Sequence, residues 1–360
     1  MYTNEFFDDH ERVVFLHDHQ TGLRAIVAIH STALGPAGGG CRIWQYPSVK
    51  DGLSDALKLS RGMSFKNALA GLPMGGGKAV IFGPLSADTR ADAFRAFGKA
   101  VNDLAGGYVT AEDVGVSVAD MQIVASVTPF VSGLSAGNGA GGDPSPYTAR
   151  GVCLGIEAAV LHNLKRRSLE GLRVAIQGLG GVGSNLAREL SLRGAKLIVA
   201  DIDPHKVEKI CDQFAAKRAP VEKVLLADVD VVAPCALGGA ITEQVALALQ
   251  APIVAGGANN QISSREAGNT LLRRQITYAP DYVVNAGGII MVAAEYYGNN
   301  DQARVDDAVS GIHYRTLELL ERSAREFRFS GDVADEMARA VIGKAAATRG
   351  SQILHASAQA

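Results

Sequence analysis

The sequence has few cysteines and no long apolar run. Its four cysteines are far apart along the 360 residues and form no C-x-x-C pair, and no H-E-x-x-H motif occurs. This pattern indicates neither a disulfide framework nor a zinc site, so we expect no metal and a reducing, cytoplasmic environment. No apolar stretch approaches the length that crosses a membrane.

The sequence also has almost no net charge, with a formal value of -2 at pH 7. A chain that binds nucleic acid or an acidic membrane surface through its overall field carries a basic excess, so we expect neither partner. The first residues, MYTNEFFDDHER, are acidic and polar, which is not typical of a signal or transit peptide. The length suggests roughly two domains.

The glycine-rich stretch from Gly62 to Val80 holds two lysines that are candidates for chemistry. Three glycines, Gly75–Gly77, directly precede Lys78, and the apolar residues 79–82 predict a buried strand that begins at Lys78. Glycine lets another group approach the backbone closely, and a lysine held against apolar surroundings loses solvation and can serve as a general acid or base. A solvated lysine after a flexible turn explains the same pattern equally well.

Lys66, the other lysine of this stretch, lies near the end of a predicted helix. Ser48 is a typical N-cap for a helix from Val49 to about Ala70, which carries an apolar stripe. A lysine at this place either neutralises the helix dipole or binds a ligand. A second glycine cluster, residues 35–40, is either a plain loop or another place where the backbone meets a ligand.

Two carboxylates follow a predicted strand. The run Tyr108–Ala111 leads directly into Glu112 and Asp113, and the ends of strands are where α/β sheets place ligands. Earlier in the chain, Val13–Leu16 and Leu23–Ile29 predict a hairpin. Strands and helices therefore mix in the N-terminal part.

A strand–glycine–helix pattern predicts a dinucleotide site. The predicted strand Arg173–Ile176 is followed at once by G-x-G-x-x-G and a helix, and the next strand, Leu197–Ala200, ends in Asp201. The glycines allow a tight turn and a close approach of a pyrophosphate to the helix N-terminus. Asp201 would accept hydrogen bonds from ribose hydroxyls and repel a 2′-phosphate, so we expect NAD rather than NADP. The motif residues are Gly178, Gly180, Gly181, Val182 and Gly183.

Alternating strands and helices after this motif predict a doubly wound parallel sheet. Two segments that contain amides and glycines, 258–260 and 280–288, end strand-like runs and are candidates for the nicotinamide half of a cofactor. The Gly-, Pro- and Ser-rich segment 129–146 predicts a hinge or linker. We therefore expect a two-domain α/β fold with a cleft between a substrate domain and a Rossmann-type dinucleotide-binding domain. The expected bounds are 1–135 for the substrate and oligomerisation domain, rejoined by about 330–360, and 145–329 for the Rossmann domain.

Several motifs run through the chain in one order: 34–37 (LGPA), 62–66 (GMSFK), 75–78 (GGGK), 110–115 (TAEDVG), 143–146 (DPSP), 233–239 (APCALGG), 258–261 (ANNQ) and 285–288 (NAGG). With them the chain resembles the glutamate/leucine/phenylalanine/valine dehydrogenases over nearly its whole length, and most nearly the members that act on leucine. The resemblance implies reversible, NAD-dependent oxidative deamination of an L-amino acid to its 2-oxo acid and ammonia. It also implies a homo-oligomer, a dimer or an octamer.

The resemblance implies roles for particular residues. Lys66 would bind the substrate α-carboxylate, Lys78 would be the general acid/base that activates water, and Asp113 would shuttle protons at the amino nitrogen. The substrate would further contact Gly38, Gly39, Met63, Ala111, Asn260, Ile289 and Val292. NAD would further contact Thr148, Cys235, Ala236 and Asn259.

Some positions depart from the leucine-specific pattern. Gly38 stands where those members usually have Leu, Ala294 stands where they usually have an acid, and Pro73–Met74 is closer to some phenylalanine-specific members. Without a side chain at Gly38, we expect a longer pocket that accepts Met, Phe or larger aliphatic side chains beside Leu. We also expect poor activity on glutamate, because no cation is present to pair with its distal carboxylate. A phenylalanine-preferring or broad enzyme stays an alternative, and so does an NAD-binding ligand sensor without catalysis.

Overall fold

The structure is a computed structural model that describes residues 2–134 and 142–358, with side chains up to residue 348. It consists of two compact units, each built from segments that are far apart in the sequence. Of the expected linker 129–146, residues 135–141 lie outside the described part. The first unit comprises Met1–Gly142, Val292–Asp301 and Met337–Ala360, and the second comprises Asp143–Met291 and Gln302–Glu336.

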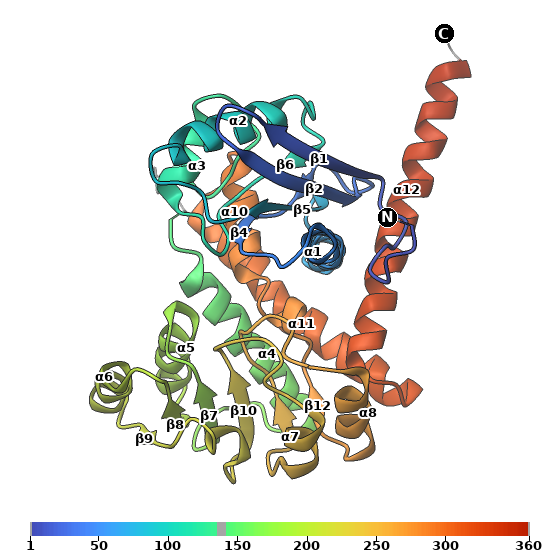
Figure 1. Ribbon diagram of the computed structural model, residues 1–360. Helices are drawn as coiled ribbons and strands as arrows, with labels where there is room; N and C mark the ends of the chain where they lie inside the picture. Colours follow the sequence, from blue (N-terminus) through green and yellow to red (C-terminus); the bar gives the residue numbers. More distant parts are fainter. Residues whose placement is uncertain (1, 135–141, 359–360) are drawn as a thin grey trace. The chain divides into compact units, whose positions relative to one another are not determined.

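The first unit is built on a mixed six-stranded sheet (Figure 1). Its path runs β1–β2–β5–β3–β6, and β4 also pairs with β5. β1 and β2 form the antiparallel hairpin that the sequence predicts, whereas β3 and β4 run parallel to β5. The strands are β1 (Arg12–Asp18), β2 (Leu23–Ser31), β3 (Ala37–Gly38), β4 (Cys41–Trp44), β5 (Gly75–Phe82) and β6 (Tyr108–Val109).

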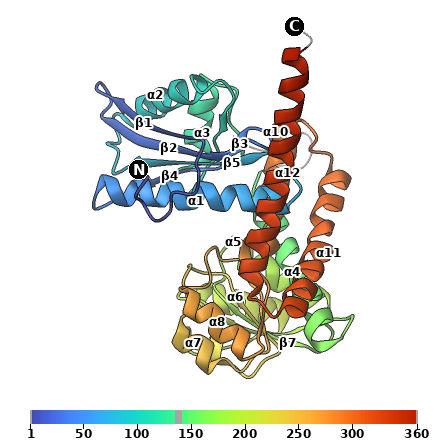
Figure 2. The ribbon, with the colours of Figure 1, turned by 90° about the vertical axis from the view of Figure 1, so that its right-hand side faces the viewer.

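Helices cover both faces of this sheet: α1 lies along one face, and α2 and α3 cover the other (Figure 2). Ser48 caps α1 as predicted, since its hydroxyl accepts a backbone N–H of the first turn. Along β5, Val80 packs in the core under α1, and Ala79 packs in the core under α2. Because side chains alternate along a strand, Lys78 faces α1. The helices are α1 (Val49–Leu69), α2 (Arg90–Asn102) and α3 (Val118–Ala125).

The three glycines before Lys78 lie inside β5, so the prediction that the strand begins at Lys78 is wrong. A Cβ on Gly76 would lie 2.0 Å from the backbone nitrogen of Ser64 in α1, and a Cβ on Gly77 would lie 2.6 Å from the ring of Tyr108. These glycines therefore let a helix and a ring approach the strand closely. Glycine occupies these positions because of packing within the unit. The sequence alone does not distinguish such glycines from those of a turn that faces a ligand.

The second unit contains a parallel six-stranded sheet of order β12–β11–β10–β7–β8–β9 (Figure 1). This confirms the predicted doubly wound arrangement, whose ligands bind where the strand order reverses, here between β7 and β10. The strands are β7 (Arg173–Gln177), β8 (Lys196–Ala200), β9 (Lys217–Arg218), β10 (Val231–Pro234), β11 (Ile253–Val254) and β12 (Thr277–Tyr278). The helices are α4 (Ser145–Leu164), α5 (Gly181–Leu192), α6 (Pro204–Phe214), the short 3-10 helix Val224–Leu226, α7 (Glu243–Ala248), α8 (Arg265–Arg273) and α11 (Gln302–Glu326).

Residues 280–288 are helical rather than strand-like, because they contain α9 (Asp281–Val284) and the start of α10 (Gly287–Tyr296). This apolar stretch is short and mostly buried, so its periodicity does not separate a strand from a helix. The segment Val292–Asp301 lies in the first unit rather than with 145–329, and there Ala293 packs against the apolar cluster of that unit. Among the described residues, no helix combines the length and the apolar character needed to cross a membrane.

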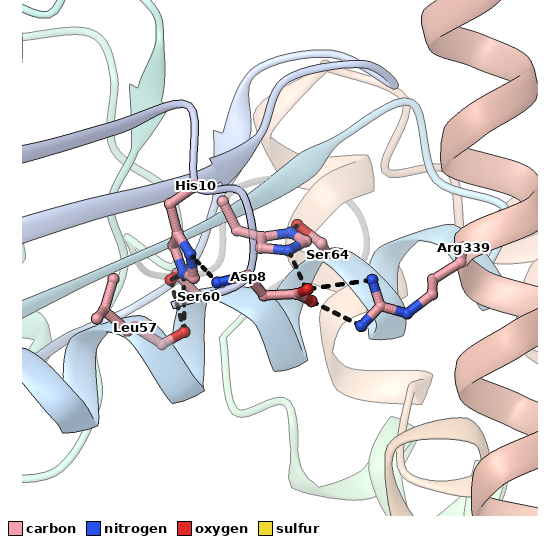
Figure 3. A network of polar contacts seen from close by, with 7 residues as sticks. Asp8, His10, Leu57, Ser60, Ser64 and Arg339 are labelled. Carbon is pink, nitrogen blue, oxygen red and sulfur yellow. Dashed lines mark hydrogen bonds and ion pairs between the residues drawn. The ribbon is translucent and has the colours of Figure 1, made fainter. Parts of the chain in front are cut away.

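The N-terminal segment ties α1 to the last helix, α12 (Ser330–Ala358), within the first unit (Figure 3). Arg339 donates from its two terminal nitrogens to the carboxylate of Asp8 at 2.7 and 3.3 Å. Asp8 also lies 3.5 Å from the ring of buried His30, whose Nδ1 lies 2.8 Å from Ser64 Oγ of α1. Burial lowers the pKa of His30 to about 4, so this ring is neutral at pH 7. The network fixes the helix that carries Lys66.

Candidate active site

The first unit brings Lys78 and Asp113 together into what we call the lysine–aspartate pair. Lys78 Nζ lies 2.7 Å from Asp113 Oδ2, and the Lys78 side chain is only 7% exposed. Cys41 explains the pairing, because in β4 it lies opposite Ala79 of β5 and it also bridges to Glu112. Lys78, which precedes Ala79, and Asp113, which follows Glu112, are therefore held side by side.

Arg42 shares the same carboxylate and was missed by sequence reasoning. Its Nε donates to Asp113 Oδ2 at 2.9 Å and its Nη1 to Asp55 Oδ2 at 3.2 Å, and Tyr46 Oη donates to Asp55 at 2.6 Å. Burial alone would raise the pKa of Asp113, but the charges of Lys78 and Arg42 outweigh it and hold that pKa below its ordinary value. Asp113 is therefore ionised at neutral pH. Nothing in the sequence links Arg42 to a carboxylate 71 positions away.

Lys66 lies in the last turn of α1 and is half-buried. The neighbouring residue fastens this turn to β5, because Asn67 Nδ2 donates to Gly75 O at 2.6 Å. Met63, one turn earlier, has its Cγ 3.3 Å from the position of a Cβ on Gly39. The structure thus places Lys66, Met63 and Gly39 where α1 rests on the sheet, on the face that carries the lysine–aspartate pair.

Gly38 does not leave an open space in the sheet. A Cβ on Gly38 would lie 2.7 Å from Met74 Cε and 3.3 Å from its sulfur. Met74 is 2% exposed and packs with Val109 and Ala293. Ala111, two residues after Val109, is half-buried. The space expected from the missing side chain is therefore filled by a methionine, and glycine alone does not lengthen the pocket.

The remaining predicted substrate residues of α10 are Ile289 and Val292. They are three residues apart, so they share one side of the helix, and both are half-buried. The division between the units falls between them, with Ile289 in the second and Val292 in the first. In the second unit, Thr148 Oγ1 donates to Pro144 O at 3.0 Å and lies 2.5 Å from the position of a Cβ on Gly288. The glycines that begin α10 therefore serve its packing on α4.

The glycine loop between β7 and α5 forms a cradle where the strand order reverses. Gly178 has a φ of +94°, and a Cβ on it would lie 2.7 Å from the nitrogen of Ala236, which follows β10. A Cβ on Gly183 would lie 1.9 Å from the Gly178 oxygen. At Gly180, no described atom lies within 4 Å of the Cβ position, and the first amides of α5 have no acceptor within the helix. This open, amide-lined corner fits a pyrophosphate. The other motif residues, Gly181 and Val182, begin α5.

Asp201 anchors the loop from the end of β8. Its Oδ2 accepts a hydrogen bond from Leu179 N at 2.6 Å and its Oδ1 accepts one from Asp203 N at 2.9 Å. Burial alone would raise the pKa of Asp201, but these backbone donors lower it below the ordinary value. The carboxylate is therefore ionised, and each oxygen keeps a lone pair for a ribose hydroxyl.

The predicted nicotinamide-side residues of the second unit gather around Gly257. Cys235 Sγ accepts a hydrogen bond from Gly257 N at 3.4 Å. Asn285 Nδ2 donates to Gly257 O at 3.2 Å and to Asn259 Oδ1 at 2.8 Å, so Asn285 positions Asn259. Asn260 is exposed and has a φ of +51°, a conformation that Asn adopts more readily than most residues. Asn285 is part of the predicted segment 280–288 and of the motif 285–288, but the sequence assigns no role to its side chain.

Together the two units define the class of protein. The second unit offers a glycine cradle and an ionised carboxylate that suit a dinucleotide, and the first holds a buried lysine in contact with a carboxylate, a pair suited to proton transfer. In the part of the chain that the structure describes, no group of three or more His, Cys, Asp or Glu side chains could hold a metal ion. The fold and site are those of a nucleotide-dependent dehydrogenase.

Comparison with known proteins identifies the family. Residues 10–129 match the family model "Glu/Leu/Phe/Val dehydrogenase, dimerisation domain", and residues 199–326 match "Glutamate/Leucine/Phenylalanine/Valine dehydrogenase". Leucine dehydrogenase of Bacillus subtilis (strain 168) is 46% identical over 88% of this chain and 87% of its own, and that of Geobacillus stearothermophilus is 48% identical over 81% and 80%. The crystal structure of L-tryptophan dehydrogenase from Nostoc punctiforme covers 93% of this chain and 96% of its own with a TM-score of 0.83 and 38% identity.

The chain therefore belongs to the glutamate/leucine/phenylalanine/valine dehydrogenase family, as its motifs predicted. This family consists of nicotinamide-nucleotide-dependent amino acid dehydrogenases, and the chain is an enzyme of this kind.

Proposed function

We propose that this protein catalyses the reversible, NAD-dependent oxidative deamination of apolar L-amino acids of the leucine type to 2-oxo acids and ammonia. The observation that carries the proposal is the lysine–aspartate pair, in contact at 2.7 Å with Lys78 buried, in a chain whose second unit has a nucleotide cradle. The leucine dehydrogenases, 46% and 48% identical, support the substrate class.

Deamination needs groups that take and return protons. Ionised Asp113 can accept a proton from the substrate ammonium, and Lys78, in contact with it, can exchange that proton. Lys78 can also take a proton from the water that attacks the substrate carbon and return one to the departing nitrogen. When bound, the nicotinamide nucleotide accepts the hydride from that carbon. Arg42 holds Asp113 in place and ionised.

We assign the substrate α-carboxylate to Lys66, because the turn of α1 that carries it rests on the same strand as Lys78. Gly38, Gly39, Met63, Ala111, Asn260, Ile289 and Val292 are the other proposed substrate contacts. A distal carboxylate would meet no cation at Gly38 or Ala111, so glutamate should be a poor substrate.

Ionised Asp201 supports NAD over NADP, since its charge would repel a 2′-phosphate. The proposed cofactor contacts are Gly178, Gly180, Gly181, Val182, Gly183, Asp201, Cys235, Ala236, Asn259 and Thr148. We further propose that the first unit binds the substrate and the second binds NAD. We also propose a cytoplasmic homo-oligomer, a dimer or an octamer; the "dimerisation domain" that matches residues 10–129 supports the oligomer.

A second candidate is a broad or phenylalanine-preferring enzyme of the same reaction. The side chain of Met74 favours it, because this flexible side chain, rather than a fixed one at position 38, fills the space next to Gly38. The resemblance to a tryptophan dehydrogenase structure points the same way.

The test is reduction of NAD by the purified protein at alkaline pH with L-amino acids one at a time. We expect activity with Leu, Val, Ile and Met, little with Glu, and none with D-leucine. NADP should replace NAD poorly. Reduction with Glu alone, or none with any L-amino acid, would contradict the proposal.

A further inference from the structure

Met74 occupies a particular place beside the proposed site. It directly precedes β5, four positions before Lys78. Its methyl carbon lies 2.7 Å and its sulfur 3.3 Å from the position of a Cβ on Gly38. Only 2% of Met74 is exposed, so a side chain of three rotatable bonds fills the volume that Gly38 leaves.

The surroundings of Met74 hold its backbone and leave the thioether as the adaptable part. Tyr297 Oη donates to Pro73 O at 2.7 Å, which fixes the chain next to Met74. The side chain packs in an apolar cluster with Val109 and Ala293. Ala293 is next to Val292 in the sequence, so the cluster adjoins another of the proposed substrate contacts.

The sheet register relates this place to the lysine–aspartate pair. Gly76 and Lys78 point to the same face of β5, and Gly38 lies opposite Gly76. Two residues along a strand span about 7 Å. Gly38 and Met74 therefore lie about one leucine side chain's length along β5 from Lys78, where the reacting carbon of the substrate would lie.

We infer that Met74 is the movable end wall of the substrate side-chain pocket and sets the largest side chain that the enzyme accepts. The inference rests on the proposed function and adds a specificity-determining residue to it. Leucine fits in front of the thioether, whereas phenylalanine requires that the thioether swing aside.

The test compares kcat/KM for phenylalanine with that for leucine in Met74→Ala, Met74→Leu and wild type. Met74→Ala removes three side-chain atoms, and a change of one methylene in such a pocket is worth about 10–200-fold. We expect the Phe/Leu ratio to rise by about that factor. Met74→Leu, which is branched and has fewer rotamers, should keep leucine turnover and lower the ratio. Both substrates are measured on one preparation, so any loss of folded protein cancels in the Phe/Leu ratio of kcat/KM.

Met121→Ala is the matched control. Met121 is also fully buried in the first unit, but it packs in the core on the other face of the sheet. It should lower stability and leave the Phe/Leu ratio unchanged.

Gly38→Ala adds a coupling test. In the wild type its Cβ would meet Met74 Cε at 2.7 Å and push the thioether into the pocket, so it should reduce activity on Phe. In the Met74→Ala background the same substitution should cost much less.

A Phe/Leu ratio that stays within about twofold in both Met74 variants, or that moves equally in Met121→Ala, overturns the inference. A wild type that oxidises no L-amino acid contradicts the proposed function instead, so the two failures are distinguishable.

Discussion

Asp113→Asn perturbs the lysine–aspartate pair with the least change of shape. In the wild type, Asp113 Oδ2 contacts Lys78 Nζ at 2.7 Å and Arg42 Nε at 2.9 Å. The substitution removes the negative charge between two cations and leaves an amide of the same size. Lys78 then keeps its position with only 7% of its side chain exposed, while Arg42 retains Asp55 at 3.2 Å.

The magnitude follows from these distances. Two unit charges 2.7 Å apart attract by about 6 kcal/mol at an effective dielectric constant of about 20, but desolvation offsets much of this. Removing one partner of a fully buried pair costs about 3–5 kcal/mol. Because 23% of the Asp113 side chain is exposed, we expect a loss of about 1–3 kcal/mol in the free energy of unfolding. Loss of the proton acceptor should lower kcat by about 10²–10⁴-fold.

The pH dependence has a definite sign. The pKa of Asp113 is lowered in the folded protein, so its stabilising effect is present above its ordinary pKa and is lost as pH falls through the lower folded value. The stability difference between wild type and Asp113→Asn should therefore be constant from neutral pH to about pH 5 and shrink below about pH 4.

The assays are kcat and kcat/KM with leucine, NAD affinity by titration, and urea unfolding. Lys78→Ala should also abolish turnover and leave NAD affinity nearly unchanged. If the two residues act as a unit, the double variant is no slower than the slower single variant. Fully additive losses, or NAD affinity that falls in parallel with the rate, would refute the reasoning.

Substitutions at three further positions, Lys66, Asp201 and His30, test other parts of the account. Lys66→Ala should raise KM for the amino acid strongly, with a smaller loss of kcat; an unchanged KM removes Lys66 from the carboxylate site. Asp201→Ser should weaken NAD use and relieve the exclusion of NADP. Asp201→Asn keeps an acceptor for Leu179 N, so it separates the effect of the charge from that of holding the glycine loop. A wild type that already uses both cofactors equally would count against a role of Asp201 in cofactor choice. The pKa of His30 in the folded protein is about 4, against an ordinary 6.5, so the free energy of unfolding should fall by up to about 3 kcal/mol as pH drops from about 6.5 to 4. His30→Gln should flatten this loss, whereas the control His17→Gln, at an exposed position, should leave it in place. Equal curves of stability against pH for wild type and His30→Gln would disprove this expectation.

Features that depend on local pattern could be predicted from the sequence. The capped helix after Ser48 and the strand–glycine–helix motif followed by Asp201 are defined by residues close together in the chain. The alternation of strands and helices predicted a doubly wound parallel sheet with right-handed crossovers, and the order of its six strands came from the structure. The roles of Lys78 and Asp113 came from the family resemblance, and the structure adds their contact, which it explains through Cys41.

Features that depend on contacts between distant residues could not be predicted. The glycines before Lys78 gave the signal of a loop, although close packing with Ser64 and Tyr108 keeps them within a strand. Arg42 carries no motif, yet together with Lys78 it holds the pKa of Asp113 below its ordinary value. In the sequence, Met74 is only a departure from the leucine-specific pattern. Its distance from Gly38 shows that it fills the space next to that glycine. In each case the decisive neighbour lies in another element of the fold.

The most direct test of the central claim is the product balance of one reaction. Purified wild-type protein is incubated with L-leucine and NAD, and reduced NAD, ammonium and the 2-oxo acid are measured at several times. Oxidative deamination predicts that the three products appear together in equal amounts and that ammonium with the 2-oxo acid and reduced NAD regenerates L-leucine. Reduced NAD without an equal amount of ammonium, or no reaction with leucine or any other apolar L-amino acid, would contradict the account.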